Sequence, residues 1–125
     1  MKIDFGSVIP VYQQIANAIE DDIISGKLLE GQNAYSQISI SKELGVNPAT
    51  AGKGIKILVD KEILVKQRGL SMTVAIGATA KLLKEKKENS LVDLMESLII
   101  EAEKIGISKE ELIANLGKYY EKRGK

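Results

Sequence analysis

The stretch Leu44-Gly45-Val46-Asn47-Pro48-Ala49-Thr50 decides the fold, because it contains the end of one helix and the start of the next. Gly45 accepts the left-handed backbone that ends many helices. Asn47 can cap the following helix through its side chain, and Pro48 suits the first helical position because its missing N–H costs nothing there. The stretch therefore predicts two helices joined by a tight turn.

The sequence ahead of this turn predicts two helices. Pro10 suits a helix start, and Ser25-Gly26 ends that helix. Ser36 caps the helix that ends at Gly45. The apolar face of the first helix consists of Ile15, Ala18, Ile19 and Ile23.

The sequence behind the turn predicts a third helix and a hairpin. The helix extends to about Asp60, and its apolar face consists of Ala51, Ile55, Leu58 and Val59. Residues 63–67 and 72–76 are β-prone, and Arg68-Gly69-Leu70-Ser71 joins them. Three helices followed by a hairpin with a basic tip form a winged helix-turn-helix, a shape that fits a helix into the major groove of DNA.

Two glycines inside the third helix are unusual, since each costs about 1 kcal/mol relative to alanine. Gly52 and Gly54 either permit close approach to DNA or a neighbouring helix, or are simply tolerated. The sequence leaves both interpretations open.

The composition excludes several classes of protein. The 125 residues include neither cysteine nor histidine, which removes thiolate chemistry, imidazole ligands and most nucleophilic triads. We therefore expect no enzyme, no metal and no cofactor.

Glu20-Asp21-Asp22 is interpreted as a solvated helix face, because adjacent helical residues point in different directions. No apolar run approaches the ~20 residues of a membrane span, and the N-terminus lacks a signal peptide, so a cytoplasmic protein is expected.

The charge distribution says more than the net charge of +1. Residues 40–75 carry six basic and three acidic side chains, whereas residues 1–39 carry two basic and five acidic ones. The positive excess therefore coincides with the predicted third helix and hairpin, although a chance imbalance on a solvated surface explains it equally well.

The composition changes after Gly77, which predicts a winged-helix domain at residues 1–76 and a two-helix tail at 77–125. Gly106 ends the first tail helix, and Ser108 with Glu111 forms a capping box for the second. Two helices with this much apolar surface cannot form an independent core, so the tail is expected to dimerise. The alternative is that it folds back on the first domain. The predicted dimer contacts are Leu91, Leu94, Met95, Leu98, Ile99, Ala102, Leu112, Leu116 and Tyr119.

Four segments of the chain carry residues at the spacings of a known family. They are Pro10, Tyr12, Gln14 and Ile15; Ile24 to Leu28 with Gly31 and Ser36; Leu44 to Thr50; and Ile63-Leu64-Val65 with Arg68-Gly69. On these residues the chain resembles the GntR family of bacterial transcription regulators, and its short tail resembles the YtrA-type subfamily. The resemblance implies a homodimeric repressor of an inverted-repeat operator, often beside genes for ATP-binding-cassette transporters.

The chain departs from the family where arginines commonly touch DNA. Ile38, Pro48 and Gly52 stand at such positions, and Leu70 follows Gly69 where the family usually has Gly-x-Gly. The operator sequence therefore cannot be inferred from relatives. A winged-helix module for protein or RNA contact, with weak or lost operator binding, is the alternative.

The remaining side chains can still form a DNA-binding surface. The predicted contacts are Ser36, Asn47, Ala49, Thr50, Lys53, Lys56, Arg68 and Gly69. Ser36 would donate to a phosphate, Thr50 and Ala49 would meet base edges, and the lysines would meet phosphates or guanines. Arg68 would enter the minor groove or contact the DNA backbone, and Gly69 is needed mainly for the conformation of the turn.

A small-molecule effector could bind in the dimer interface, where Tyr119 and Tyr120 could line a pocket, although packing is the simpler use of these tyrosines.

Overall fold

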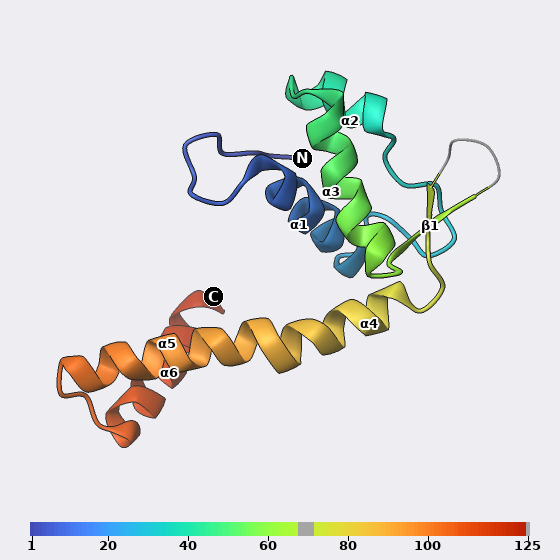
Figure 1. Cartoon of the computed structure of the whole chain (residues 1–125). Coiled ribbons are helices and arrows are strands. Elements are labelled where there is room, and N and C mark those ends of the chain that lie inside the picture. The colour runs from blue at the N-terminus through green and yellow to red at the C-terminus, as the bar shows by residue number, and fades with distance from the viewer. Residues whose placement is uncertain (68–71, 125) are drawn as a thin grey trace. The chain divides into compact units, whose positions relative to one another are not determined.

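The computed structural model of the chain describes residues 1–67 and 72–124. The chain divides into two compact units, Met1–Lys84 and Glu85–Lys125. The first unit contains the helices α1, α2 and α3 with a hairpin, and the second contains α5 and α6 (Figure 1). Of the helices within the described residues, none is long and apolar enough to cross a membrane.

The three helices of the first unit begin and end where the sequence signals predict. They are α1 (Val11–Ile24), α2 (Gln37–Leu44) and α3 (Pro48–Asp60). Ser36 is the N-cap of α2, and Gly45 ends α2 in the left-handed conformation at φ 67°. The predicted class, mainly α with a small hairpin, is confirmed.

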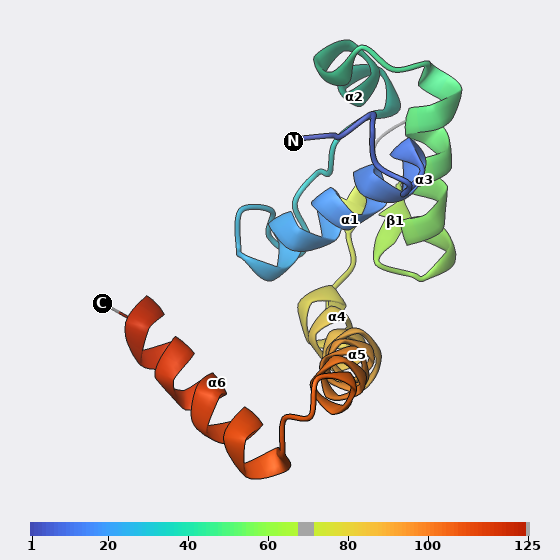
Figure 2. The same cartoon turned by 90° about the vertical axis from the view of Figure 1, so that its left-hand side faces the viewer.

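The core of the first unit lies between these helices, and α3 packs against both α1 and α2 (Figures 1 and 2). The apolar side chains of these three helices that are 5% exposed or less are Ile15, Ala16, Ile19, Ile23, Ile40, Ala51, Ile55 and Leu58. Two predicted core residues, Ala18 and Val59, are only half-buried. Ala16 is buried in place of Ala18, because the side of α1 that faces the core includes the residue next to Ile15.

Close packing of two helices explains one of the glycines in α3. A Cβ atom on Gly54 would lie 2.8 Å from the backbone oxygen of Tyr12 and 3.0 Å from the Ile15 side chain. Such a distance to a backbone atom is too short for any side chain. Gly54 therefore permits the close approach of α3 to α1.

The hairpin consists of two short antiparallel strands, β1 (Leu64–Lys66) and β2 (Met72–Val74). Both are shorter than the predicted runs 63–67 and 72–76. The register pairs Leu64 with Val74, Val65 with Thr73, and Lys66 with Met72. Asn33 forms a bridge to Thr73, so the connector between α1 and α2 lies alongside β2.

A short helix, α4 (Ala78–Glu85), follows the hairpin and contributes to the first core. Ala78 and Leu82 are each 1% exposed within that core. The two units consequently divide after Lys84, and not at the composition change near Gly77. The composition of the sequence does not reveal that Ala78 and Leu82 attach α4 to the core of the first unit.

A carboxylate in the connector between α1 and α2 fastens the start of α4. Glu30 accepts backbone hydrogen bonds from Gly77 at 2.8 Å and from Thr79 at 3.1 Å. These bonds, that from Gly77 foremost, lower the pKa of the Glu30 carboxyl. Glu30 thus satisfies backbone donors at a helix start that its own sequence leaves without a capping side chain.

The second unit begins with a π-helical turn, η1 (Lys86–Ser90), that leads into α5 (Leu91–Lys104). Gly106 follows α5 with φ 75°, and α6 covers Lys109–Arg123. The Ser108 hydroxyl accepts the Glu111 N–H at 3.2 Å, which is one half of the predicted capping box.

Candidate nucleic-acid interface

The first turn of α3 contains three of the predicted contact residues. Asn47 is the N-cap, and its side-chain oxygen accepts the Ala49 N–H at 2.8 Å. Asn47 and Ala49 are exposed, and Thr50 is half-buried. The end of the helix that first enters the major groove in helix-turn-helix proteins therefore carries small, accessible side chains.

Ser36 begins α2 and forms a reciprocal cap with Ser39. The Ser36 hydroxyl accepts the Ser39 N–H at 3.0 Å, and the Ser39 hydroxyl accepts the Ser36 N–H at 3.1 Å. A hydroxyl that accepts one bond can still donate its hydrogen. The predicted phosphate contact of Ser36 is compatible with this cap and stays a prediction.

Lys53 on α3 lies over an aromatic ring of α1. Its amino nitrogen is 4.0 Å from the centroid of the Tyr12 ring, within the range of a cation–π interaction. Lys53 is exposed, whereas Tyr12 is half-buried. The pair places a cation where α1 and α3 approach each other, and sequence reasoning did not connect the two residues.

Lys56, one turn further along α3, has an acidic partner. Its amino nitrogen lies 3.0 Å from the Asp60 carboxylate, and both side chains are more than 60% exposed. An exposed pair of this kind contributes little to stability. The lysine can therefore exchange Asp60 for a phosphate at small cost.

Gln37 joins this surface although the sequence analysis did not select it. A Cβ atom on Gly52 would lie 3.0 Å from the amide carbon and oxygen of Gln37, so this side chain lies over the glycine. A cavity of about 230 Å³ is located here. Its lining consists of Ser36, Gln37, Gly52, Ile55, Lys56, Val59 and Met72. The only signal in the sequence was Gly52, which leaves room on α3 for a side chain from α2.

The predicted contacts at the hairpin tip, Arg68 and Gly69, lie outside the described residues. The strand that leads to the tip ends with the exposed Lys66. Beyond it, the Gln67 amide donates to the Thr73 hydroxyl at 3.0 Å. The described part of the hairpin thus contributes one exposed cation.

The acidic run on α1 is not the solvated face that was expected. Glu20 is 5% exposed, and its carboxylate lies 3.1 Å from the amino nitrogen of Lys61. The opposite charge of Lys61, which is distant in sequence, compensates the loss of water around the buried Glu20 carboxylate. Within the described residues, no group of three acidic side chains is arranged to hold a metal ion.

Asp22 in the same run accepts a hydrogen bond of 2.5 Å from the Tyr35 hydroxyl. Burial and this bond raise the pKa of Tyr35 to about 12. The bond ties the segment that precedes α2 to the middle of α1. Two of the three acidic residues thus serve the architecture of the first unit.

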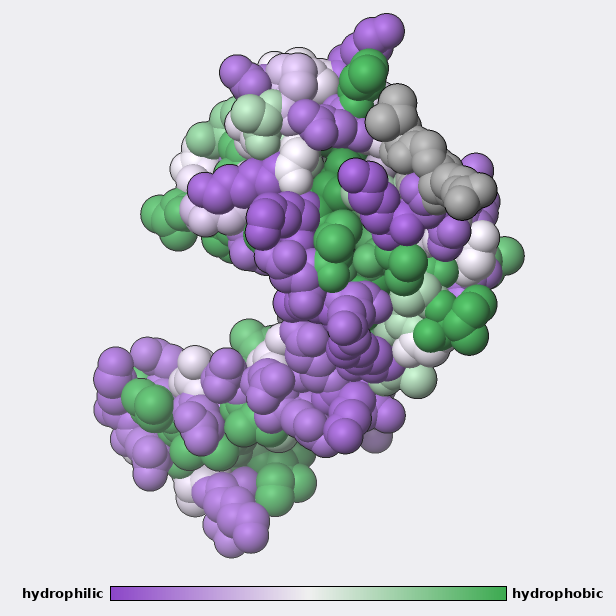
Figure 3. All heavy atoms as spheres, turned by 45° about the vertical axis from the view of Figure 1, so that its right-hand side comes forward, coloured by the Kyte–Doolittle hydropathy of each residue, from purple (hydrophilic) through white to green (hydrophobic). Residues whose placement is uncertain are grey.

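The second unit exposes a broad apolar surface on α5 and α6. Figure 3 shows hydrophobic residues of this unit at the surface between hydrophilic ones. Among the predicted dimer contacts, those that are 40% exposed or more are Leu91, Leu94, Met95, Leu98, Ile99, Leu116 and Tyr119. Leu112 is half-buried, and Ala102 is 5% exposed. Exposed apolar side chains in this number mark an interaction surface.

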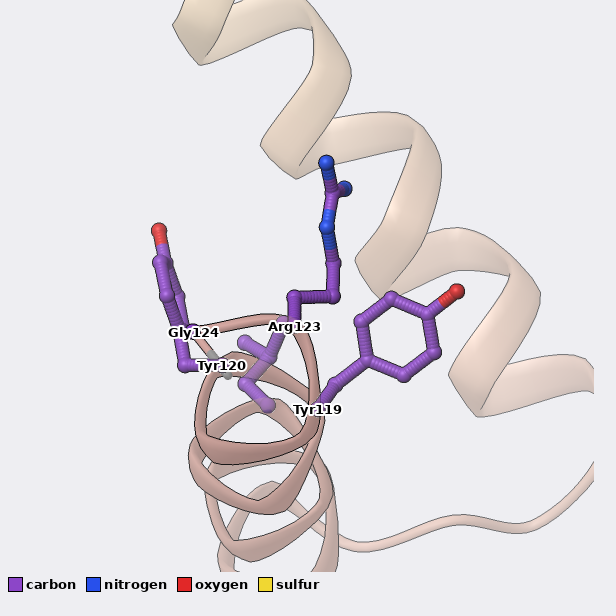
Figure 4. Close-up of a pocket in the computed structure, with 5 residues that line it drawn as sticks. Tyr119, Tyr120, Arg123 and Gly124 are labelled. Carbon is purple, nitrogen blue, oxygen red and sulfur yellow. The ribbon is translucent and has the colours of Figure 1, made fainter.

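The described residues of the second unit line at least two cavities. One of about 450 Å³ is formed by both helices, with Leu98 and Ala102 from α5 and Leu112 from α6 among its lining residues. The other, of about 520 Å³, is lined by α6 and the following Gly124. There Tyr119 and Tyr120 point to different sides of α6 with Arg123 between them (Figure 4).

Comparison with known sequences links the chain to bacterial regulators, although no family model matches it. The HTH-type transcriptional repressor YtrA of Bacillus subtilis is 27% identical over 112 residues, which cover 90% of the chain and 85% of YtrA. The HTH-type transcriptional regulator YdeF of the same organism is 30% identical over 87 residues, or 68% of the chain. This match spans only 19% of YdeF.

Comparison with solved structures gives the same result over nearly the whole chain. A GntR family transcriptional regulator from Listeria monocytogenes has a TM-score of 0.74 at 28% identity, with 91% of this chain and 98% of that chain covered. YtrA from Sulfolobus acidocaldarius, a GntR-family transcription factor, has a TM-score of 0.58 at 26% identity and full coverage of both chains. BusR from S. agalactiae, in complex with its busA-promotor DNA, has a TM-score of 0.52 at 27% identity, covering 89% of this chain and 57% of that one.

Proposed function

The chain belongs to the GntR family of transcriptional regulators, of the YtrA type, and from this membership we propose that it is a homodimeric repressor of an inverted-repeat operator. Its general role is DNA-binding regulation of transcription, and it is not an enzyme. The proposal concerns how many copies act together, which kind of DNA site they bind and what the binding does.

The observation that carries the DNA-binding part of the proposal is the accessible first turn of α3, together with the start of α2, which lies against the following turns of that helix. Asn47 and Ala49 are exposed there, and Ser36 retains a hydroxyl donor. Lys53 and Lys56 follow on α3, each with a partner that DNA phosphates can replace. Small side chains toward base edges and cations toward phosphates form the pattern that a major groove accepts.

The unpartnered apolar surface of α5 and α6 supports the homodimer. A second copy presents the same apolar set, so a two-fold contact buries both surfaces at once. Leu98 and Leu116 are still 40% and 42% exposed in the single chain. Dimeric helix-turn-helix proteins bind half-sites about 34 Å apart, so two copies related by a two-fold axis would require an inverted repeat in the DNA.

The relatives support repression as the result of binding. The Bacillus subtilis relative is named a transcriptional repressor, and BusR is recorded on promoter DNA. Genes for ATP-binding-cassette transporters are the candidate targets that the subfamily resemblance implies. A cytoplasmic location follows from the proposal, because operator DNA lies there in bacteria. A small-molecule effector remains a proposal that rests on the two cavities of the second unit.

Fluorescence anisotropy tests the proposal directly. The probe is the DNA upstream of the chain's own gene, compared with a scrambled duplex of the same composition at two salt concentrations. We expect preferential binding to the upstream DNA that weakens as salt rises, because phosphate contacts release counterions. Equal affinity for both duplexes at both salt concentrations contradicts operator recognition. Sedimentation in the same buffers reports whether the bound species is a dimer.

A further inference from the structure

We propose that Gln37 is a specificity-determining residue, whose amide lies over Gly52 and recognises an adenine of the operator in the major groove. The inference rests on the proposed function and deepens it. It assigns base recognition to a side chain from α2, at a place where α3 itself carries a glycine.

The position of the amide follows from its contact with Gly52. The amide carbon, oxygen and nitrogen of Gln37 lie 3.0, 3.0 and 3.2 Å from the place where a Gly52 Cβ would stand. Gly52 lies three residues after Ala49 and four before Lys56, so these three residues share one face of α3. Ala49 and Lys56 are exposed on that face. The Gln37 amide therefore occupies the side-chain position between two residues of the predicted DNA-binding surface.

The amide is available for a ligand. Gln37 is exposed, and within the described residues its side chain makes no hydrogen bond. Other glutamines of the first unit are engaged, since Gln13 donates to Asn17 at 2.9 Å and Gln14 donates to the Asp4 and Ile9 carbonyls. A free amide beside a recognition helix differs from these structural glutamines.

The neighbouring side chains on α3 leave base recognition to this amide. Lys53 lies over the Tyr12 ring, and Lys56 pairs with Asp60. Each lysine is therefore suited to replace its present partner with a DNA phosphate. Ala49 offers only a methyl group, and Thr50 is half-buried. Gln37 therefore presents an amide at this surface whose donor and acceptor are both unengaged by the described residues, whereas the Asn47 side-chain oxygen accepts the Ala49 N–H and the Ser36 hydroxyl accepts the Ser39 N–H.

The chemistry of the amide selects the base. In the major groove, adenine presents the N6 amino donor beside the N7 acceptor, and a glutamine amide pairs with both. A carboxylate of the same shape can only accept, and it favours the N4 amino group of cytosine. Replacing the amide nitrogen of this side chain by an oxygen, as in Gln37→Glu, is therefore predicted to change the preferred base from adenine to cytosine.

The test is selection of binding sites from randomised duplexes, followed by anisotropy on the selected site and on its single-base variants. Wild type is expected to require adenine at one position of each half-site. Gln37→Ala is expected to lose about tenfold or more of the discrimination at that position alone. Gln37→Glu is expected to move the preference there to cytosine. Gln13→Ala is the matched control, because its amide bonds within α1, and it should keep every preference of the wild type.

A second variant tests the contact itself. Gly52→Ala suits a helix better than glycine, so folding is retained, but its methyl group would stand 3.0 to 3.2 Å from the Gln37 amide, which must then shift by a few tenths of an ångström. The same base position should lose part of its discrimination, and less than in Gln37→Ala. If Gly52→Ala keeps that discrimination unchanged, the contact does not position the amide and the inference is wrong.

The outcomes separate the inference from the proposed function. If wild type enriches no sequence, operator recognition fails and the role of Gln37 fails with it. If wild type enriches a site and Gln37→Ala keeps the same preferences at every position, the role of Gln37 is overturned while the proposed function stands. Loss at one position in Gln37→Ala, with a shift to cytosine in Gln37→Glu, supports the inference.

Discussion

The carboxylate of Glu20 lies 3.1 Å from the amino nitrogen of Lys61, and the two residues are separated by 41 positions in the chain. Glu20 is 5% exposed, whereas the Lys61 side chain is 35% exposed. A buried carboxylate is stable only with a partner that compensates its loss of water. The pair therefore connects α1 to the residue that directly follows α3.

Breaking this pair from its two sides should have unequal effects. Lys61→Met leaves a buried carboxylate without this cation, and we expect a loss of about 2–3 kcal/mol in the free energy of unfolding. Glu20→Gln leaves a neutral amide in the same space and should cost less. Urea unfolding monitored by circular dichroism measures both values. If Glu20→Gln loses more free energy of unfolding than Lys61→Met, the main role of Lys61 is not to compensate the buried negative charge of Glu20.

The close approach at Gly54 predicts that alanine is harmful there. The added methyl group would lie 2.8 Å from the Tyr12 backbone oxygen, and we expect Gly54→Ala to destabilise the first unit by about 1–3 kcal/mol. Gly117→Ala in α6 is the matched control, since nothing lies within 4 Å of its Cβ position and alanine favours a helix. Thermal unfolding of both variants decides the matter; a Gly54→Ala protein as stable as wild type contradicts the observed helix contact.

Tyr35 makes stability depend on alkaline pH. Its folded-state pKa is raised to about 12 from an ordinary value of 10.0, so the folded protein favours the protonated phenol. This contribution is fully present below pH 10 and is lost as the pH rises through 12. Tyr35→Phe should lower stability at neutral pH and remove this part of the alkaline loss. Urea midpoints between neutral and strongly alkaline pH measure it, with the exposed Tyr120→Phe as control.

Lys53 is expected to contribute to DNA binding through phosphate contact. Lys53→Ala should weaken binding by a similar factor for all sequences and reduce the salt slope by about one, while the dimer stays intact. Tyr12→Leu, which removes the ring that a phosphate must displace from Lys53, should not weaken binding, and Tyr12→Phe, which keeps the ring, should leave it nearly unchanged. Anisotropy across a salt series measures these effects, and an unchanged affinity in Lys53→Ala removes this residue from the contacts.

Leu98 is expected to lie in the dimer contact. Leu98→Asp would bury a charge there and should convert the dimer to a monomer. Ser97→Asp adds the same charge at the adjacent, exposed position of α5 and should leave the dimer intact. Sedimentation at several concentrations distinguishes the two states. A Leu98→Asp protein that remains dimeric places the interface elsewhere.

The local signals predicted the helices because they act between residues close in sequence. Ser36, Gly45 and Asn47 cap or end helices through bonds that span two to four residues, and each has this role in the structure. The spacing of apolar residues on α3 likewise predicted Ala51, Ile55 and Leu58 as buried.

The predictions that failed depended on contacts distant in sequence. The sequence predicts Glu20 in solvent because its partner Lys61 lies 41 positions further along the chain. Gln37 was missed for the same reason, since its position over Gly52 exists only once α2 has packed on α3. The predicted DNA and dimer contacts remain predictions.

The internal partners of the two α3 lysines have a consequence for the search for a target site. Lys53 contacts the Tyr12 ring and Lys56 forms an ion pair with Asp60. In the unbound protein both cations therefore have a partner within the protein. Random DNA, which offers phosphates without matching base edges, must compete with these partners for each lysine. With a net charge of only +1, the protein should dwell briefly on random DNA and be released quickly. It would then locate its target by repeated short encounters from solution more than by long sliding along the chromosome.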